Sequence, residues 1–269
     1  HLMGQILSHP SSRPETNCFV AESTKHGVIG YALVSPEIPI NRAVASGGVL
    51  AEHRNSGIGK LLLRCVNEYV ESIGVETFHI QTSADSLDAQ HFLESAGFSH
   101  VKDYWQMRWE NGKLPQITLP EGFGLRTFQL NRDEEDLTLI QNTAFGEHWG
   151  FCPNTVEEVA ARVRMENTDP DGIIFISAGD NLAGYNWTLR NQNAHGSVGF
   201  VSMTGVHPDY RGNGLGTAVV VTGMDYLRRQ GIDAIELEVD STNTPAVALY
   251  RKLGFKLVNH TTWYEKRQR

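Results

Sequence analysis

The chain has 269 residues, 40% of them hydrophobic, which is enough to fill two cores of ordinary domain size. Its 31 acidic and 23 basic residues give a net charge of −8. That balance argues against nucleic acid as a partner, because binding to a phosphate backbone needs a basic surface. No apolar run approaches the roughly 20 residues of a membrane span, so we expect no membrane partner either. Three widely spaced cysteines predict reduced thiols and a cytoplasmic location.

Apolar periodicity and turn residues predict a series of strands and helices before residue 112. The strands are expected at residues 18–22, 28–34, 43–50, 77–82 and 100–109, and the helices at residues 58–73 and 88–95. The longer helix has apolar residues at i, i+3, i+4 and i+7, and Gly74 ends it. Residues 4–16 contain two prolines and no apolar period, so they predict a loop.

A segment with Gly112, Pro115 and Pro120 marks a boundary, which predicts one domain at residues 1–112 and a second at residues 119–269. Thr155 and Glu158 form the capping-box pattern that opens a helix. In this half, strands are expected at residues 124–130, 172–178, 182–189, 198–206, 235–239 and 257–264, and helices at residues 133–145, 155–165, 217–230 and 245–253.

A glycine-rich loop, Arg-Gly-Asn-Gly-Leu-Gly-Thr at residues 211–217, lies between an expected strand and an expected helix. Such a loop points backbone N–H groups and a helix N-terminus at one small volume, and this arrangement binds phosphate. A side chain at Gly212, Gly214 or Gly216 would hold the backbone away from a ligand or require an unfavourable φ. Arg211 adds a positive charge at the rim.

The same loop occurs earlier in the chain, because residues 54–59 match residues 211–216 at an offset of 157. The offset continues without a gap, so that Gly97 and Phe98 fall on Gly254 and Phe255. An internal repeat with so long a period predicts two tandem domains rather than a solenoid.

The first copy is shorter than the second at its start. Arg211 follows Glu121 by 90 residues (211 − 121), whereas Arg54 follows residue 1 by only 53 (54 − 1), a difference of about 37 residues. We therefore expect the first domain to be truncated at its N-terminus, without the opening strand and two helices of the second.

These motifs resemble the GNAT superfamily of acyl-CoA-dependent N-acyltransferases. The resemblance lies in Arg-x-x-Gly-x-Gly after a strand, then an Asn, then Tyr-x-x-x-Gly-Phe, here Arg211, Gly214, Gly216, Asn243, Tyr250, Gly254 and Phe255. It covers nearly the whole chain as a tandem pair, which is also similar to the mycothiol-synthase-like branch. The resemblance implies an α/β fold of two GNAT-type domains, each a mixed, mostly antiparallel sheet flanked by helices. It also implies acetyl-CoA as a cosubstrate, with no metal.

The resemblance assigns residues to acetyl-CoA. The loop would hold the pyrophosphate, the strand before it would pair with the pantetheine arm, and the N–H of Val206 would bond the thioester carbonyl. The residues implied in cofactor binding are Thr204, Gly205, Val206, Arg211, Gly212, Asn213, Gly214, Leu215, Gly216, Thr217 and Asn243, with Arg54, Gly57 and Gly59 in the first copy.

Tyr250 is the expected catalytic acid, because a phenol is protonated at neutral pH and can give its proton to the departing thiolate. By the 157-residue offset, its counterpart in the first copy is Leu93, and the counterpart of Asn243 is Ser86. Leucine has no proton to donate. We therefore expect the first domain to bind CoA or to be structural, without turnover.

The catalytic base is less clearly indicated. Many relatives carry an acid on the strand that enters the loop, but residues 199–204 contain neither a carboxylate nor an imidazole. Glu147 and His148, in a segment rich in glycine and aromatic residues, are the alternative candidates. The other interpretation of this segment is aromatic packing at a helix end.

The sequence thus predicts an N-acetyltransferase that moves an acetyl group from acetyl-CoA to a small-molecule amine, with one working domain. One alternative is mycothiol-synthase-like acetylation of a cysteinyl conjugate, and another is a non-catalytic acyl-CoA-binding protein. A protein lysine acceptor is a further possibility. The acceptor, the acyl chain length and the oligomeric state are not readable from the residues.

Overall fold

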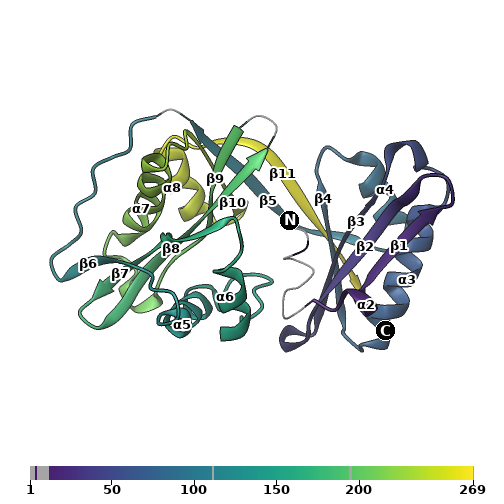
Figure 1. Ribbon diagram of the computed structural model, residues 1–269, viewed down its shortest axis with the longest axis horizontal. Coiled ribbons are helices and arrows are strands. Elements are labelled where there is room, and N and C mark those ends of the chain that lie inside the picture. Colours follow the sequence, from purple (N-terminus) through teal and green to yellow (C-terminus); the bar gives the residue numbers. More distant parts are fainter. Residues whose placement is uncertain (1–3, 5–11, 111, 194–195, 269) are drawn as a thin grey trace. The chain divides into compact units, whose positions relative to one another are not determined.

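The computed structural model describes residues 4, 12–110, 112–193 and 196–268, which form two compact units (Figure 1). Unit 1 contains the described residues up to Asp103 and those from Thr261 onward. Unit 2 is Tyr104–His260. The chain thus passes from unit 1 to unit 2 within one strand and returns within another.

Unit 1 is a sheet covered by helices. Its elements are α2 (Pro14–Asn17), β1 (Cys18–Ser23), β2 (Gly27–Glu37), η1 (Ile38–Ile40), β3 (Arg42–Val49), η2 (Ala51–His53), α3 (Ile58–Ser72), β4 (Thr77–Ser83), α4 (Leu87–Ser95), and parts of β5 (Ser99–Glu110) and β11 (Lys256–Arg267). The sheet order is β1-β2-β3-β4-β11, and β3–β4 is its parallel pair. Helix α3 buries Leu62, Val66 and Val70 on one face. Pro14–Asn17 is helical, which corrects the expectation of a loop throughout residues 4–16.

Unit 2 is the larger sheet. Its elements are β6 (Phe123–Thr127), α5 (Glu134–Phe145), α6 (Val156–Arg162), β7 (Thr168–Ala178), β8 (Asn181–Asn193), β9 (Gly196–Val206), η3 (Pro208–Tyr210), α7 (Leu215–Arg229), β10 (Ala234–Asp240) and α8 (Thr244–Lys252). The order is β5-β10-β9-β8-β7-β6, and β9–β10 is parallel while the neighbouring described pairs are antiparallel. The predicted mixed, mostly antiparallel sheet flanked by helices is confirmed.

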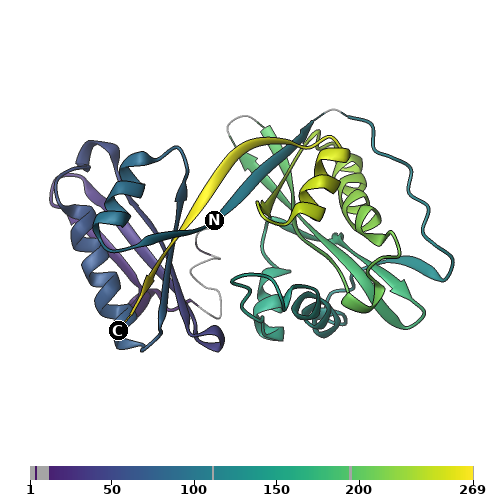
Figure 2. The same cartoon turned by 180° about the vertical axis from the view of Figure 1, so that it is seen from behind.

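Two apolar layers cover the sheet of unit 2, with α7 and α8 on one side and α5 and α6 on the other (Figures 1 and 2). The first layer includes Leu215 and Met224 of α7 with Leu237 of β10. The second includes Leu137 of α5 and Trp187 of β8. Side chains that alternate along each strand therefore supply both layers.

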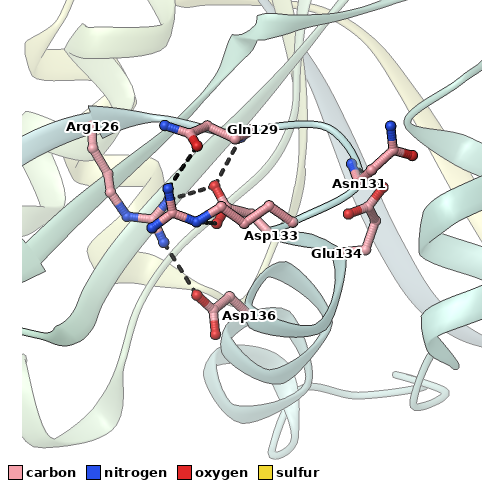
Figure 3. A network of polar contacts seen from close by, with 7 residues as sticks. Arg126, Gln129, Asn131, Asp133, Glu134 and Asp136 are labelled. Carbon is pink, nitrogen blue, oxygen red and sulfur yellow. Dashed lines mark hydrogen bonds and ion pairs between the residues drawn. The ribbon is translucent and has the colours of Figure 1, made fainter.

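Helix α5 is fixed at its start by a polar network (Figure 3). The side chain of Asp133 is 2% exposed, accepts from Arg126 Nη1 at 2.5 Å, and accepts from the backbone N–H of Gln129 at 2.8 Å. Arg126 also reaches Asp136 at 3.2 Å. A buried carboxylate needs such partners to offset its desolvation. The network therefore sets where the far end of α5 lies, at Phe145.

Strands β9 and β10 separate toward the end of the sheet. Their parallel pairing runs from Val198–Ala234 to Val201–Leu237, although β9 continues to Val206 and β10 to Asp240. Ser202 of β9 is an extra residue between the pairs Trp187–Met203 and Thr188–Val201, and this bulge increases the local twist of β9 against β8. Among the described residues, the last part of β9 therefore has no partner in β10.

The repeat is visible element by element at the 157-residue offset. Helix α3 matches α7, β4 matches β10, α4 matches α8 and β5 matches β11, each end to end. Within the described residues of unit 1, β6, α5 and α6 have no counterpart.

The last strand of each repeat lies in the unit of the other. Tyr104–Glu110 of β5 pairs with β10 in unit 2, and Thr261–Arg267 of β11 pairs with β4 in unit 1. The expected boundaries at residues 1–112 and 119–269 follow the order of the repeats along the chain. The compact units instead exchange their final strands.

Candidate active site

A cavity of about 610 Å³ opens where β9 and β10 separate, within unit 2. It is bordered by the end of α5, the end of β9, the glycine loop, the start of α7 and helix α8. The predicted site residues in its lining are Thr204, Gly205, Val206, Arg211, Gly212, Gly214, Leu215, Gly216, Thr217, Asn243, Tyr250 and His148. Asn213 and Glu147 are not in the lining.

The glycine loop has the backbone that its sequence predicts. Gly212 and Gly214 have φ values of 83° and 75°, which L side chains rarely adopt. Gly214 is the N-cap of α7 and offers no side chain to the first helical N–H groups. Those groups therefore point into the cavity unpaired, which suits a phosphate. Asn213 instead donates from Nδ2 to the carbonyl of Tyr210 at 3.1 Å and holds the loop from outside.

Gly205 allows the end of α5 to lie close to β9. A Cβ at this position would stand 2.9 Å from Cβ of Ala144 and 3.2 Å from Cε2 of Phe145. Ala144 and Phe145 consequently reach the cavity wall. No pattern in the sequence indicates this contact, because it depends on a helix 60 residues away (205 − 145).

Arg211 joins the loop to the end of α5. Its Nη2 donates to the carbonyl of Ala144 at 3.1 Å, and Nη1 lies 3.7 Å from a carboxylate oxygen of Glu147. The Arg211 side chain is 46% exposed, so the ion pair is screened and weak. Its charge lies at the cavity rim. There it provides a hydrogen-bond donor for the Ala144 carbonyl, near the end of α5, where helix carbonyls have no partner within the helix.

Tyr250 lines the cavity from α8 and is buried. Burial raises the pKa of its phenol to about 12, so the group is protonated at neutral pH. The ring packs against Phe255 with centroids 5.8 Å apart, which fixes its orientation. Within the described residues, its hydroxyl makes no hydrogen bond and is available to a ligand.

Asn243 both caps α8 and lines the cavity. Its Oδ1 accepts from the backbone N–H of Ala246 at 3.2 Å, a typical N-cap contact. The amide nitrogen of the same side chain can still donate to a ligand, because the cap uses the oxygen alone.

His148 lines the cavity and is solvent-exposed there, whereas its neighbour Glu147 is exposed outside the lining. The His148 ring packs edge-on against Phe145, with centroids 4.7 Å apart. Burial, and then the charge of Arg211, lower the pKa of His148 below its ordinary 6.5, which makes it neutral at neutral pH. The Glu147 side chain is 86% exposed. The structure brings together Tyr250 and His148 but not Glu147.

Family membership follows from the sequence profile of the Acetyltransferase (GNAT) family, which matches residues 3–98 and 135–255. The chain belongs to this family. It is therefore an acetyl-CoA-dependent GNAT N-acetyltransferase built from two tandem GNAT segments.

Curated relatives agree over most of the chain. The mycothiol acetyltransferase of Pseudarthrobacter chlorophenolicus is 32% identical over 238 residues, which cover 87% of this chain and 72% of that protein. The mycothiol acetyltransferase of Actinosynnema mirum is 36% identical over 214 residues, which cover 79% of this chain and 71% of that protein.

Solved structures share the tandem GNAT fold. A tandem GNAT protein from the clavulanic acid biosynthesis pathway matches with a TM-score of 0.75 at 17% identity. The match covers 99% of this chain and 87% of that protein's chain. A GCN5-related N-acetyltransferase from Sphaerobacter thermophilus has a TM-score of 0.74 at 24% identity, covering 94% and 81%.

The first GNAT segment retains the loop and its arginine, but it has Leu93 and Ser86 in place of Tyr250 and Asn243. Gly57 keeps a φ of 87° at the start of α3, and Asn55 takes the left-handed conformation of Gly212. Arg54 donates to the carbonyl of Val49 at 3.2 Å. Leu93 is buried in the core of unit 1, where it packs as an ordinary apolar residue.

Two further features of this GNAT protein concern metals and membranes. In the described part of the chain, no group of three or more His, Cys, Asp or Glu side chains is placed to hold a metal ion. None of the helices in the described ranges is both long and apolar enough to cross a bilayer.

Proposed function

We propose that unit 2 transfers the acetyl group of acetyl-CoA to the primary amine of a small molecule, with Tyr250 as the acid and His148 as the base. The observation that carries this proposal is a single cavity lined by the glycine loop, Tyr250 and His148. Acyl transfer needs an anion cradle, a proton donor and a proton acceptor around one carbonyl, and the cavity supplies all three.

The cradle binds the charged end of acetyl-CoA. The pyrophosphate accepts from the N–H groups at the start of α7, near Leu215 and Gly216, and the helix dipole favours its charge. The pantetheine arm then runs into the gap between β9 and β10. There the backbone of residues 204–206 pairs with its amides, and the N–H of Val206 polarises the thioester carbonyl.

Attack and collapse follow in that gap. The acceptor arrives as an ammonium and loses a proton to the neutral imidazole of His148, directly or through water. The free amine adds to the thioester carbon and forms a tetrahedral intermediate. The C–S bond then breaks, and the phenol of Tyr250 gives its proton to the departing thiolate of CoA. The nitrogen gives up its remaining excess proton to the resulting phenolate through water, and His148 releases its proton to solvent. The products are an N-acetyl amide and free CoA.

The relatives named mycothiol acetyltransferases direct the choice of acceptor. We propose a cysteinyl conjugate of an amino sugar as the first acceptor to be tested. The mechanism differs from that of many GNAT proteins in its base. Phe200 and its neighbours on β9 offer no carboxylate that could take the proton. For this reason His148, from the end of α5, takes the proton in our mechanism.

An acceptor screen with acetyl-CoA tests the proposal. The full chain is incubated with a cysteinyl amino-sugar conjugate, simple primary amines and a lysine-rich peptide, and thiol release is followed over time. Mass spectrometry then distinguishes N-acetylation from S-acetylation. We expect turnover with a small amine. Thiol release no faster than acetyl-CoA hydrolysis with every acceptor, in wild type and Tyr250→Phe alike, would contradict the proposal.

A further inference from the structure

One arginine of unit 2 is half-buried and has no carboxylate partner. Arg162 is the last residue of α6. Among the described residues of unit 2, every other arginine forms an ion pair except Arg251, whose side chain is exposed. A partly buried charge is normally paired, because its desolvation is costly otherwise. The charge of Glu158, one turn earlier on α6, acts on Arg162, but this carboxylate accepts from the backbone N–H of Thr155 at 2.9 Å in the capping box. Arg162 therefore differs from its neighbours in having no carboxylate at ion-pair distance.

The guanidinium of Arg162 is nevertheless held in place. It lies over the ring of Trp187, 4.8 Å from the ring centroid, and Nη1 donates to Oδ1 of Asn154 at 3.2 Å. The Asn154 backbone N–H in turn donates to Oδ1 of Asn142, on α5, at 2.9 Å. Burial lowers the pKa of Arg162, in line with its position between α6 and the sheet. A guanidinium carries five N–H donors, and Asn154 takes only one.

Three buried polar side chains beside Arg162 also lack partners. The hydroxyl of Tyr185, both amide atoms of Gln141 and Nε1 of Trp187 are buried without hydrogen bonds within the described residues. Tyr185 and Gln141 are fully buried, and Trp187 is 1% exposed. The Gln141 amide lies close enough to the Tyr185 hydroxyl to act on its pKa, so these two groups also face each other. A buried polar group without a partner lowers the stability of the folded state, so something is expected to pair with these groups.

These groups lie on one face of β8, directly behind the wall of the cavity. Tyr185 and Trp187 are two residues apart on that strand and point into the layer formed with α5 and α6. Tyr185 pairs with Gly205 of β9, and its Cε1 would lie 3.4 Å from a Cβ on that glycine. Its ring also packs against Phe145, with centroids 6.5 Å apart. Gly205 and Phe145 both line the cavity.

We propose that Arg162, Tyr185 and Gln141 form a binding site for a carboxylate group, adjacent to the acetyl-transfer cavity. A guanidinium matches a carboxylate with two parallel hydrogen bonds, and the phenol and amide add further donors to its oxygens. The bound carboxylate is the counter-ion that Arg162 lacks. A cation is excluded by the charge of Arg162. A neutral amide would leave that charge unpaired.

The site selects among acceptors, and in this respect it rests on the proposed function. It favours amines with a free carboxylate over a cysteinyl conjugate of an amino sugar, because the cysteine carboxyl of that conjugate is bound in an amide. An acceptor with both an amine and a carboxylate would place the carboxylate on Arg162 and its amine toward the thioester. The same chemistry also accommodates a free carboxylate ion, so the site has two sources of ligand. Binding and turnover must therefore be measured separately.

Binding is tested with acetate on the full chain, without acetyl-CoA. Thermal unfolding is followed as acetate replaces chloride at constant ionic strength and neutral pH. We expect Tm to rise with acetate and to saturate, because a ligand that binds the folded state stabilises it. Arg162→Gln and Tyr185→Phe should remove or weaken the rise, and acetamide should not produce it. Arg229→Gln, which removes an exposed arginine of the same unit, is the matched control.

Turnover is tested with alanine and alaninamide, which differ only in the carboxylate. We expect wild type to favour alanine and Arg162→Gln to raise its KM about tenfold or more, the range for losing a charged hydrogen bond. The kcat for alanine and both constants for alaninamide should change little. Arg162→Lys keeps the positive charge but loses the two parallel N–H donors of the guanidinium. Its KM for alanine should lie between the values for wild type and Arg162→Gln.

The two measurements separate the possible failures. An acetate-dependent rise in Tm that persists in Arg162→Gln would overturn the carboxylate site, as would the absence of any rise in wild type. Such a result would mean that Tyr185 and Gln141 enclose only buried water. If neither amine is acetylated, the acetate titration alone decides on the site, and the acceptor screen decides separately on the proposed function.

Discussion

At the scale of single residues, Tyr250 carries the sharpest expectation. Its buried phenol, with a pKa raised to about 12, remains protonated over the whole useful pH range and can neutralise the leaving thiolate. Tyr250→Phe keeps the ring that packs on Phe255 but removes the proton. We expect kcat to fall by roughly 10²–10⁴-fold, the usual contribution of a positioned acid. Acetyl-CoA affinity, measured by calorimetry, should stay within a few fold. Retention of most of the activity would contradict this role.

His148 predicts a pH dependence. A base must be unprotonated, so kcat/KM should rise as pH increases through the pKa of His148. Burial and Arg211 lower that pKa, and the midpoint of the acid limb should therefore lie below 6.5. His148→Ala should lower kcat and flatten this limb without changing the affinity for acetyl-CoA. His207→Ala, in which the removed ring contacts Tyr210 across the loop, provides a histidine control outside the lining. A wild-type acid limb with its midpoint above pH 6.5 would argue against His148 as the base. So would an acid limb that is the same in His148→Ala as in wild type.

Residue identity allowed much of the site to be predicted, but not all of it. The glycine loop is recognisable because its short motif occurs twice in the chain. Tyr250 is recognisable because it belongs to a short motif characteristic of the family. The roles of Gly205 and Ala144 depend on contact between a strand and a helix distant in sequence. Arg162 gives no signal at all in the sequence, since only the fold shows that it lacks a carboxylate partner.

At the scale of elements, the loop before α7 controls binding of CoA. Gly214→Val places a β-branched side chain at a φ of 75°, a conformation that costs of order 1–3 kcal/mol and displaces the first N–H groups of the helix. We expect acetyl-CoA affinity to fall at least 100-fold in calorimetry, while circular dichroism shows the fold retained. Gly231→Val is a matched control, because Gly231 has a φ of 76° at the other end of α7, outside the cavity. Equal losses of affinity in both variants would mean that strain alone, rather than the cradle, is responsible.

The elements themselves follow closely from periodicity and turn residues. The expected helix at residues 58–73 is α3 at Ile58–Ser72, and the expected strand at residues 77–82 is β4 at Thr77–Ser83. The separation of β9 from β10 was not predictable, because apolar alternation continues through β9 and gives no sign of where pairing stops.

At the scale of the whole molecule, the exchange of final strands determines which repeat stabilises which unit. Tyr264 and Met107 occupy equivalent positions in the two repeats, 157 residues apart (264 − 107). Tyr264 belongs to the second repeat but is buried in the core of unit 1, where its hydroxyl donates to Gln90 at 3.3 Å. Met107 belongs to the first repeat but is buried in the core of unit 2. The order of residues along the chain would assign each of them to the other core.

This exchange predicts opposite effects for two matched substitutions. Tyr264→Ala should destabilise unit 1 and Met107→Ala unit 2, each by about 2–5 kcal/mol, the usual cost of truncating a large buried side chain. Hydrogen exchange followed by mass spectrometry measures each unit separately. In Tyr264→Ala, exchange should quicken in peptides from α3 and β4, which share the core of Tyr264. In Met107→Ala it should quicken in α7 and β10. If each substitution instead loosened the unit of its own repeat, the final strands would not be exchanged in solution.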